Sequence, residues 1–245
     1  SSEAVLSFEE KEAGVALIDI GGGTTDLAIF KDGIIRHTAV IPFGGNVITD
    51  DIKEGCSIIE KQAELLKIRF GSAWPGENRD TEIVSIPGLR GRDPKEISLK
   101  TLSKIINARV IEIIEQTFLE IKNYGHNDLK KKLIAGIVLT GGGSQLKHLK
   151  QLVEYITGMD TRVGYPSEHL AGNTQESVSS PMFATSVGLL MNALDAKIIN
   201  EAEDEVDIGE TKISENEKSS KDVSKKRKSI LDRFGEKLKE FLDNA

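Results

Sequence analysis

Apolar and polar positions alternate along this chain in a way that predicts strands and helices in turn. Residues 16–30 hold two short apolar runs on either side of three glycines and two hydroxyl residues. This order is typical of a strand, a tight turn and a returning strand. Further strands are expected at residues 34–42, 83–86, 134–140 and 162–163.

Helical periodicity fills the segments between these strands. After two glycines, Asn46 or Thr49 is expected to cap a helix that runs towards Glu60, and a second helix is expected to stop at Gly71. The longest helix is predicted over residues 98–125, where large apolar residues recur three and four positions apart. These apolar residues are Leu102, Ile105, Ile106, Ile113, Ile114, Phe118 and Ile121.

Two more helices are predicted, over about 144–157 and 181–196. Strands and helices that alternate in this way indicate an α/β domain in which helices flank a mixed sheet. The folded part is expected to span residues 1–196. A polar stretch with three prolines suggests a smaller subdomain inserted over about 72–135.

The composition changes at residue 197. Residues 197–224 are rich in Glu, Asp, Ser and Lys and almost free of large apolar groups, so they are expected to form a disordered linker. A basic run at 225–228 follows, and Ser229 can cap a helix over 230–242. At about 100° per residue, the six large apolar residues of this helix share an arc of about 120°. They are Ile230, Leu231, Phe234, Leu238, Phe241 and Leu242.

This last segment, residues 225–245, has the pattern of a helix that lies in an anionic membrane interface. From 225 to 243 it carries seven basic and four acidic residues, although the whole chain has a net charge of -7. Basic residues beside an apolar face suit anionic headgroups. The alternatives are a helix that docks onto its own domain and a coiled-coil helix.

Composition narrows the possible functions. With 245 residues, 38% hydrophobic and 29% charged, the chain can form one large or two small domains. The net negative charge argues against nucleic-acid binding. A single cysteine, Cys56, fits a reducing cytosol. No run approaches a membrane span, and a start at Ser1 without methionine suggests a fragment.

The glycine turn near residue 20 is the first candidate for a binding site. Consecutive glycines let backbone N–H groups close around an anion, and a carboxylate just before the turn can meet a metal ion or its water shell. An ordinary hairpin tip is the alternative, but it needs none of the flanking polar residues. The candidates are Asp19, Gly21, Gly22, Gly23, Thr24 and Thr25, with Asp26 beside them.

A second glycine turn, about 120 residues later, follows the strand expected at 134–140. Its candidate residues are Gly142, Gly143 and Ser144. Alone, such a turn can serve packing, but two such turns suggest one nucleotide held between them. Glu64 and Lys67, three residues apart on a helix, are either a solvated surface pair or a bracket for ribose and adenine.

These motifs resemble those of a known superfamily. Residues 19–26 look like the second phosphate motif of the actin, heat-shock chaperone and sugar kinase superfamily, 138–145 like its adenosine motif, and 184–188 like its second connecting motif. Within it, the chain most resembles the FtsA family of bacterial actin-like cell division proteins. The segments that fit this family are 41–51, 63–67 and 136–142.

The resemblance implies an actin-like, ribonuclease H-like ATPase domain that binds ATP and Mg²⁺. Asp19 would hold the metal through water, residues 21–24 the phosphates, Glu64 and Lys67 the nucleoside, and the second turn would lie beside it. The chain corresponds to the second half of the family, subdomains IIA and IIB. Because the family's first phosphate motif is not in this stretch, weak or no ATP binding by the chain alone is expected, and no catalytic residue is assigned.

Partners also follow from the resemblance. In FtsA-like proteins the IIB subdomain receives the acidic carboxy-terminal tail of FtsZ, and Arg109, helped by Lys104 and Asn107, would bind it here. The implied function is an adaptor that polymerises, tethers the FtsZ ring to the cytoplasmic face of the inner membrane and recruits other divisome proteins. The alternative is an actin-like ATPase of MreB, PilM or chaperone type.

Overall fold

The computed structural model describes residues 1–79, 81–88, 93–125, 133–166 and 178–207, with side chains as far as 196. The chain divides into two compact units. The larger unit is Leu6–Gly164, and the smaller contains Ser1–Val5 and the residues from Tyr165 onward. Each unit is described by itself.

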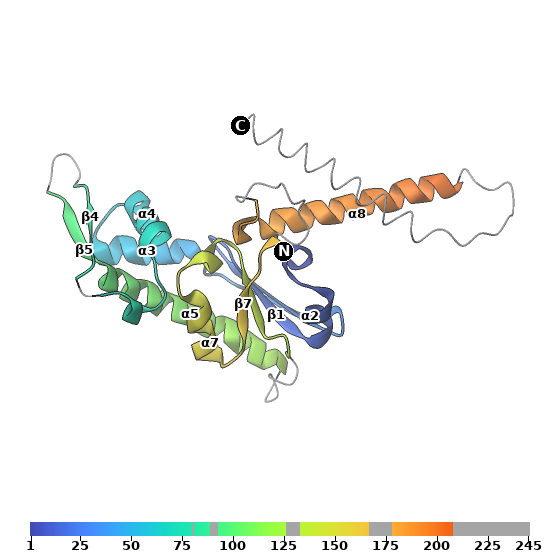
Figure 1. The fold of residues 1–245 in the computed structure, drawn as a ribbon, viewed down its shortest axis with the longest axis horizontal. Helices are drawn as coiled ribbons and strands as arrows, with labels where there is room; N and C mark the ends of the chain where they lie inside the picture. Colours follow the sequence, from blue (N-terminus) through green and yellow to red (C-terminus); the bar gives the residue numbers. More distant parts are fainter. Residues whose placement is uncertain (80, 89–92, 126–132, 167–177, 208–245) are drawn as a thin grey trace. The chain divides into compact units, whose positions relative to one another are not determined.

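The larger unit is built on a mixed five-stranded sheet with the strand order β3-β2-β1-β6-β7 (Figure 1). β1 pairs antiparallel with β2 and parallel with β6, so the predicted hairpin and the α/β class are confirmed. The strands are β1 Val15–Ile20, β2 Thr25–Lys31, β3 Ile34–Ile41, β6 Ile137–Thr140 and β7 Thr161–Val163. β6 begins three residues later than expected, because Gly136 turns the backbone at a φ of +73°.

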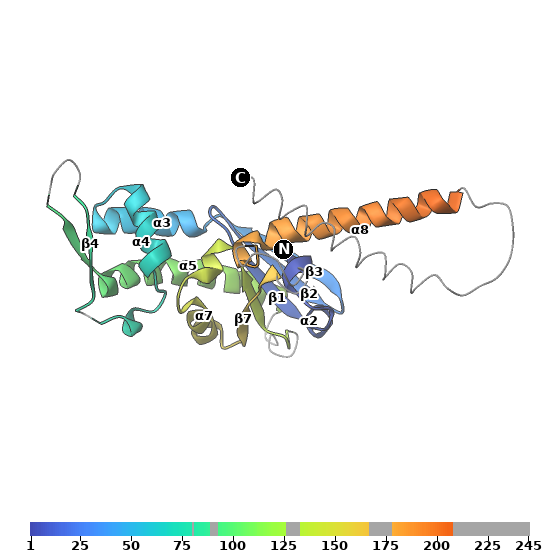
Figure 2. The ribbon, with the colours of Figure 1, turned by 45° about the horizontal axis from the view of Figure 1, so that its top comes forward.

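The core lies between the sheet and a long helix, α5 (Leu99–Gly125), which contacts β2 and β3. The predicted apolar stripe of α5 is buried, with Ile105 and Phe118 only partly so. From the sheet, Ile18, Ile29 and Leu139 join the same apolar cluster. A shorter helix, α7 (Leu149–Thr157), packs beside α5 in both views (Figures 1 and 2).

A second, two-stranded sheet lies at the far end of α5 (Figure 1). β4 (Ile83–Ile86) confirms the strand predicted there, and it pairs antiparallel with β5 (Lys95–Ser98). Two helices, α3 (Gly45–Cys56) and α4 (Glu60–Phe70), pack together at this end, and α3 also packs on α5. The predicted boundaries of the inserted subdomain stay a prediction.

Two helix starts were predicted wrongly. α3 begins at Gly45 after an extended Gly44 with no side-chain cap, so neither Asn46 nor Thr49 caps it. After the second glycine turn, residues Gly142–Gln145 form a 3₁₀ turn, and α7 begins only at Leu149. Between them His148 adopts a left-handed conformation with a φ of +61°, which a right-handed helix does not contain. The Lys147 carbonyl beside it accepts a hydrogen bond from the backbone of Ala73 at 2.8 Å.

The smaller unit contains α1 (Ser2–Val5), a 3₁₀ turn (Pro181–Phe183) and α8 (Ala184–Asp207). α1 packs against α8. The predicted last helix is therefore present, but it continues eleven residues past 196, into the segment expected to be a linker. Residues 208–224 and the predicted membrane helix lie outside the described residues. None of the described helices is both long enough and apolar enough to cross a membrane.

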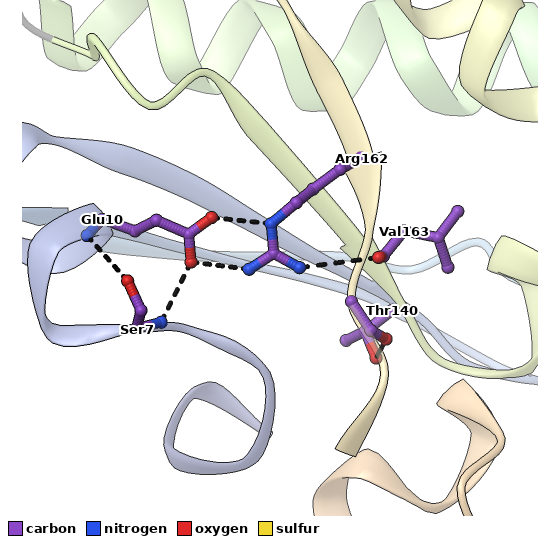
Figure 3. Close-up of polar contacts among 6 residues, drawn as sticks. Ser7, Glu10, Thr140, Arg162 and Val163 are labelled. Carbon is purple, nitrogen blue, oxygen red and sulfur yellow. Dashed lines mark hydrogen bonds and ion pairs between the residues drawn. The ribbon is translucent and has the colours of Figure 1, made fainter. Parts of the chain in front are cut away.

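An ion pair ties a short helix, α2 (Phe8–Ala13), to the edge strand β7 (Figure 3). Ser7 and Glu10 form a capping box at the start of α2. Arg162 on β7 donates through Nε and Nη2 to the two Glu10 carboxylate oxygens, each at 2.6 Å. The pair is half-buried, with 19% of the Glu10 side chain exposed. Glu10 thus holds both the helix start and the sheet edge.

Replacing Glu10 should therefore destabilise the fold. Glu10→Ala is expected to lower the free energy of unfolding by about 1–3 kcal/mol at neutral pH, because it removes a cap and leaves Arg162 without this partner. Urea denaturation measures the change. Glu12→Ala, at an exposed site on the same helix, is the matched control. An equal loss in both variants would contradict the role of Glu10.

The same pair predicts a pH dependence. Burial tends to raise the pKa of Glu10, but hydrogen bonds from Arg162 and Ser7 outweigh it and hold the pKa below its ordinary 4.5. A carboxylate with a lowered folded-state pKa stabilises fully above its unfolded pKa and loses that effect as the pH falls through the folded value. The stability difference between wild type and Glu10→Ala should shrink below about pH 4.5.

Candidate functional site

The two glycine turns follow the carboxyl ends of two adjacent strands, at the same edge of the sheet. The first turn (residues 21–24) follows β1, and the second turn (residues 141–145) follows β6. These strands are parallel neighbours in which Asp19 lies opposite Thr140, so their carboxyl ends coincide. The second turn packs closely on β1, because a Cβ on Gly143 would overlap the Ile20 side chain. The predicted pairing of the two turns is therefore present in the fold.

Asp19 stands at the junction of the two turns. It is half-buried, and a Cβ on Gly141 would overlap its Oδ1 atom. Across the sheet, Asp26 on β2 is its direct antiparallel partner. Directly opposed residues on adjacent strands point to the same face, so this edge carries two carboxylates side by side.

The two carboxylates at this edge could bind Mg²⁺ only if water or phosphate oxygens supplied the remaining ligands. Mg²⁺ keeps several waters and binds proteins through one or two carboxylates together with phosphates. Asp19 and Asp26 match that description. Within the part of the chain that the structure describes, no three His, Cys, Asp or Glu side chains are grouped to hold a metal by themselves.

The residues of the first turn divide into open and occupied groups. Gly22, Gly23 and Thr24 are exposed, and the turn is closed by the N–H of Gly21, which donates to the Thr24 carbonyl at 2.9 Å. Thr25 differs from them. It is buried, and its hydroxyl donates to the Phe43 carbonyl at 2.8 Å. Thr25 thus differs from the exposed Gly22, Gly23 and Thr24, although the Thr24 hydroxyl also donates to the Asp26 carboxylate at 3.3 Å.

The N-terminal end of α3 is hydrogen-bonded to the first turn. The N–H groups of Gly45 and Asn46 donate to the carbonyls of Gly21 and Gly22, each at 2.8 Å. Gly44 is required for this contact, because a Cβ there would lie 2.6 Å from the Gly21 carbonyl oxygen. The glycine turn at residues 21–24 and the N-terminal end of α3 are thus joined by backbone hydrogen bonds.

Glu64 and Lys67, both on α4, form a polar cluster with Thr49 of α3. The Lys67 ammonium donates to the Gly45 carbonyl at 2.8 Å, to the Thr49 hydroxyl at 2.7 Å and to Glu64 at 2.7 Å. An ammonium has three hydrogens, so these contacts can use all of them. Only 15% of the Lys67 side chain is exposed, against 42% for Glu64. Glu64 is the member that can meet a ligand.

Electrostatics keep Glu64 charged. Burial alone raises the pKa of this carboxyl, but hydrogen bonds from Lys67 and from the Thr49 hydroxyl, with the Lys67 charge, bring it below its usual value. Thr49 is itself buried. The cluster thus presents an ionised carboxylate, an acceptor suited to hydroxyl groups such as those of a ribose.

A groove of about 930 Å³ opens beside this carboxylate, between α3 and α4. Asn46, Thr49, Glu64 and Leu65 are among its lining residues. Asn46 also borders the first turn, where its Oδ1 lies 3.2 Å from the position of a Cβ on Gly22. The site therefore includes Asn46 and Thr49, which sequence reasoning placed only as helix caps.

The residues of the second turn, predicted to lie beside a nucleoside, differ in exposure. Gly142 is exposed and Gly143 half-buried. Ser144 is buried, and its hydroxyl donates to the Gly141 carbonyl at 2.7 Å. The turn is therefore a close-packed backbone wall, with Ser144 securing its shape.

The three predicted partner-binding residues on α5 also differ from one another. Lys104 is exposed. Asn107 donates to the Ala73 carbonyl at 2.7 Å, and Arg109 is ion-paired with Asp51 and Glu112. Two of the three are thus engaged within the chain.

Comparison with known proteins assigns the family. The model of the family described as "Cell division protein FtsA" matches residues 16–188, which include both glycine turns and the α4 cluster. The chain belongs to the FtsA family. FtsA of Neisseria meningitidis is 41% identical over 190 residues, 78% of this chain and 45% of the relative. FtsA of Escherichia coli is 36% identical over 207 residues, 83% and 49% respectively.

The chain thus spans about half the length of the curated relatives that it matches. Solved structures show an actin-like fold, as the resemblance predicted. MreB5 of Spiroplasma citri bound to ADP has a TM-score of 0.63 at 24% identity, and the alignment covers 81% of this chain and 58% of the MreB5 chain. The PilM–PilN type IV pilus biogenesis complex scores 0.56 at 17% identity, with coverages of 76% and 47%. The MamK double helical filament scores 0.54 at 18% identity, with 73% and 54%.

The contact between α3 and the first turn yields a stability prediction. Gly44→Ala is expected to cost about 1–3 kcal/mol in the free energy of unfolding, because its Cβ has no room beside Gly21 and Gly22. Gly23→Ala is the control, since nothing lies within 4 Å of a Cβ there. Thermal or urea denaturation of both variants measures the difference. Equal stability of the two would show that α3 does not need this approach.

Proposed function

We propose that this chain supplies one wall of an ATP site in a bacterial cell-division adaptor. One observation carries the proposal: the two glycine turns meet at one sheet edge, at Asp19, next to the groove that holds the Glu64 carboxylate. The groove volume lies within the usual range for small-molecule sites. The family match and the MreB5 structures with bound ADP and AMPPNP support a nucleotide ligand.

Each part of the site would have a distinct task. The exposed backbone of Gly22 and Gly23 would receive phosphate oxygens. Glu64, with Asn46 beside it, would hold the ribose, and the second turn would bound the nucleoside. Asp19 and Asp26 would hold Mg²⁺ through water, and the ion would offset phosphate charge. Nucleotide would support assembly here, and no residue is assigned to catalysis.

The wider role in the proposal is that of a scaffold. The chain would polymerise with copies of itself, tether the FtsZ ring to the cytoplasmic face of the inner membrane through residues 225–245, and recruit other divisome proteins. The FtsA match favours this role over that of an MreB or PilM type. The description of the MamK neighbour as a double helical filament supports self-assembly. Arg109 would dock the acidic carboxy-terminal tail of FtsZ.

Nuclear magnetic resonance tests the nucleotide wall, because it detects weak binding. Millimolar ATP with Mg²⁺ should shift the amide signals of Gly22, Gly23 and Gly142. Asp19→Asn should weaken binding roughly tenfold with Mg²⁺, about 1.4 kcal/mol, and little in EDTA. Asp32→Asn, in the turn that joins β2 to β3 at the opposite end of β2, should bind as wild type does. Unshifted glycine signals would contradict the site.

Flotation with phosphatidylglycerol–phosphatidylethanolamine vesicles tests the membrane tether. Phe234→Glu should abolish flotation of the full chain, because it places a charge within the apolar arc. Glu236→Gln, on the side away from that arc, should float at least as well as wild type. A Phe234→Glu chain that still floats would overturn the tether.

A further inference from the structure

The guanidinium of Arg109 is already occupied by carboxylates of its own chain. Its Nε and Nη2 atoms donate to the two oxygens of Asp51 at 2.6 and 3.0 Å. Its Nη1 atom donates to Glu112 at 2.5 Å. The guanidinium carbon also lies 6.0 Å from the centre of the Phe43 ring. The Nε and Nη2 donors of Arg109, which would bind a partner carboxylate, are thus already bound to Asp51 of α3.

The contact between Asp51 and Arg109 has the same geometry that a carboxylate of a bound peptide would adopt at Arg109. A guanidinium binds a carboxylate best through two parallel N–H···O bonds, which Asp51 already makes. The side chains of Arg109 and Asp51 are 26% and 29% exposed, so water reaches the pair. Solvent-accessible ion pairs contribute modestly to stability and can exchange partners. Separating Asp51 from Arg109 should therefore cost little free energy.

We propose that Asp51 is an internal competitor for the carboxylate-binding fork of Arg109, so that an acidic peptide docks on α5 by displacing Asp51. The inference rests on the proposed docking at Arg109. It also sets a requirement on the partner. One peptide carboxylate only replaces what Asp51 supplies, so a bound peptide must gain its net affinity from additional contacts.

Displacement would be felt along α3. This helix begins against the first turn, carries Thr49 into the Lys67 cluster and carries Asp51 to α5. Loss of the Asp51 contact removes a polar tie between α3 and α5. Peptide binding should therefore increase hydrogen exchange in the α3 backbone, which a peptide docking elsewhere on α5 would not do.

Fluorescence anisotropy on the full chain, with a labelled synthetic peptide of the acidic FtsZ tail, tests the competition. Asp51→Asn should tighten binding roughly threefold to tenfold, because it removes the charged competitor. Arg109→Ala should weaken binding strongly. Glu54→Gln is the matched control: it removes the same charge three residues further along α3, at an exposed site. It should leave the affinity unchanged.

The outcomes separate the competitor from the docking site. If Arg109→Ala weakens binding but Asp51→Asn leaves it unchanged or weaker, the competition is overturned and the docking proposal stands. If Arg109→Ala leaves affinity unchanged, docking at Arg109 is itself wrong. Should Asp51→Asn fold poorly, the Nε–H resonance of Arg109 in the wild-type chain decides. A signal that does not move on saturation with peptide overturns the exchange.

Discussion

The parallel pairing of β1 with β6 is the interaction on which the candidate site depends. These strands are separated by more than a hundred residues, yet Asp19 lies opposite Thr140. Because both strands run in the same direction and end at the same level, their glycine turns meet at one edge of the sheet. A shift of this register by one residue would turn Asp19 to the other face and separate the turns.

Helix α3 connects this edge to the rest of the larger unit. Its start is bound to the first turn, its middle contacts α4 through Thr49, and Asp51 reaches α5. Thr49 and Asp51 are two positions apart in a helix, so they project to nearly opposite sides. One rigid element thus touches both the candidate nucleotide groove and the candidate peptide site. This arrangement gives a physical route by which the two sites can influence each other.

The polar groups of the site are largely ordered before any ligand arrives. The Lys67 ammonium donates to Gly45, Thr49 and Glu64, and Glu64 is the exposed, ionised residue of this cluster. Groups held in this way lose little conformational freedom when a ligand binds. The close approaches at Gly44 and Gly143 serve the same end, because they hold the two turns without side chains between them.

Much of the local structure could be predicted from the chain alone. The hairpin around residues 21–24, the buried stripe of α5 and the end of α4 at Gly71 depend on backbone freedom and periodicity, which neighbouring residues determine. The family motifs likewise located Asp19, Glu64 and Lys67 as site candidates. These features are local, so one stretch of sequence is enough to specify each.

Only the tertiary structure decided which polar side chains are open and which are occupied. Thr49 and Asn46 look like helix caps in sequence, but packing of α3 against the first turn and α4 makes them part of the groove. Thr25 and Ser144, predicted from the sequence as ligand contacts, donate in this structure to the carbonyls of Phe43 and Gly141. Arg109 looks like an exposed cation and is held by Asp51, 58 positions earlier. The partner of a polar side chain depends on which distant elements fold beside it, and no local pattern carries that information.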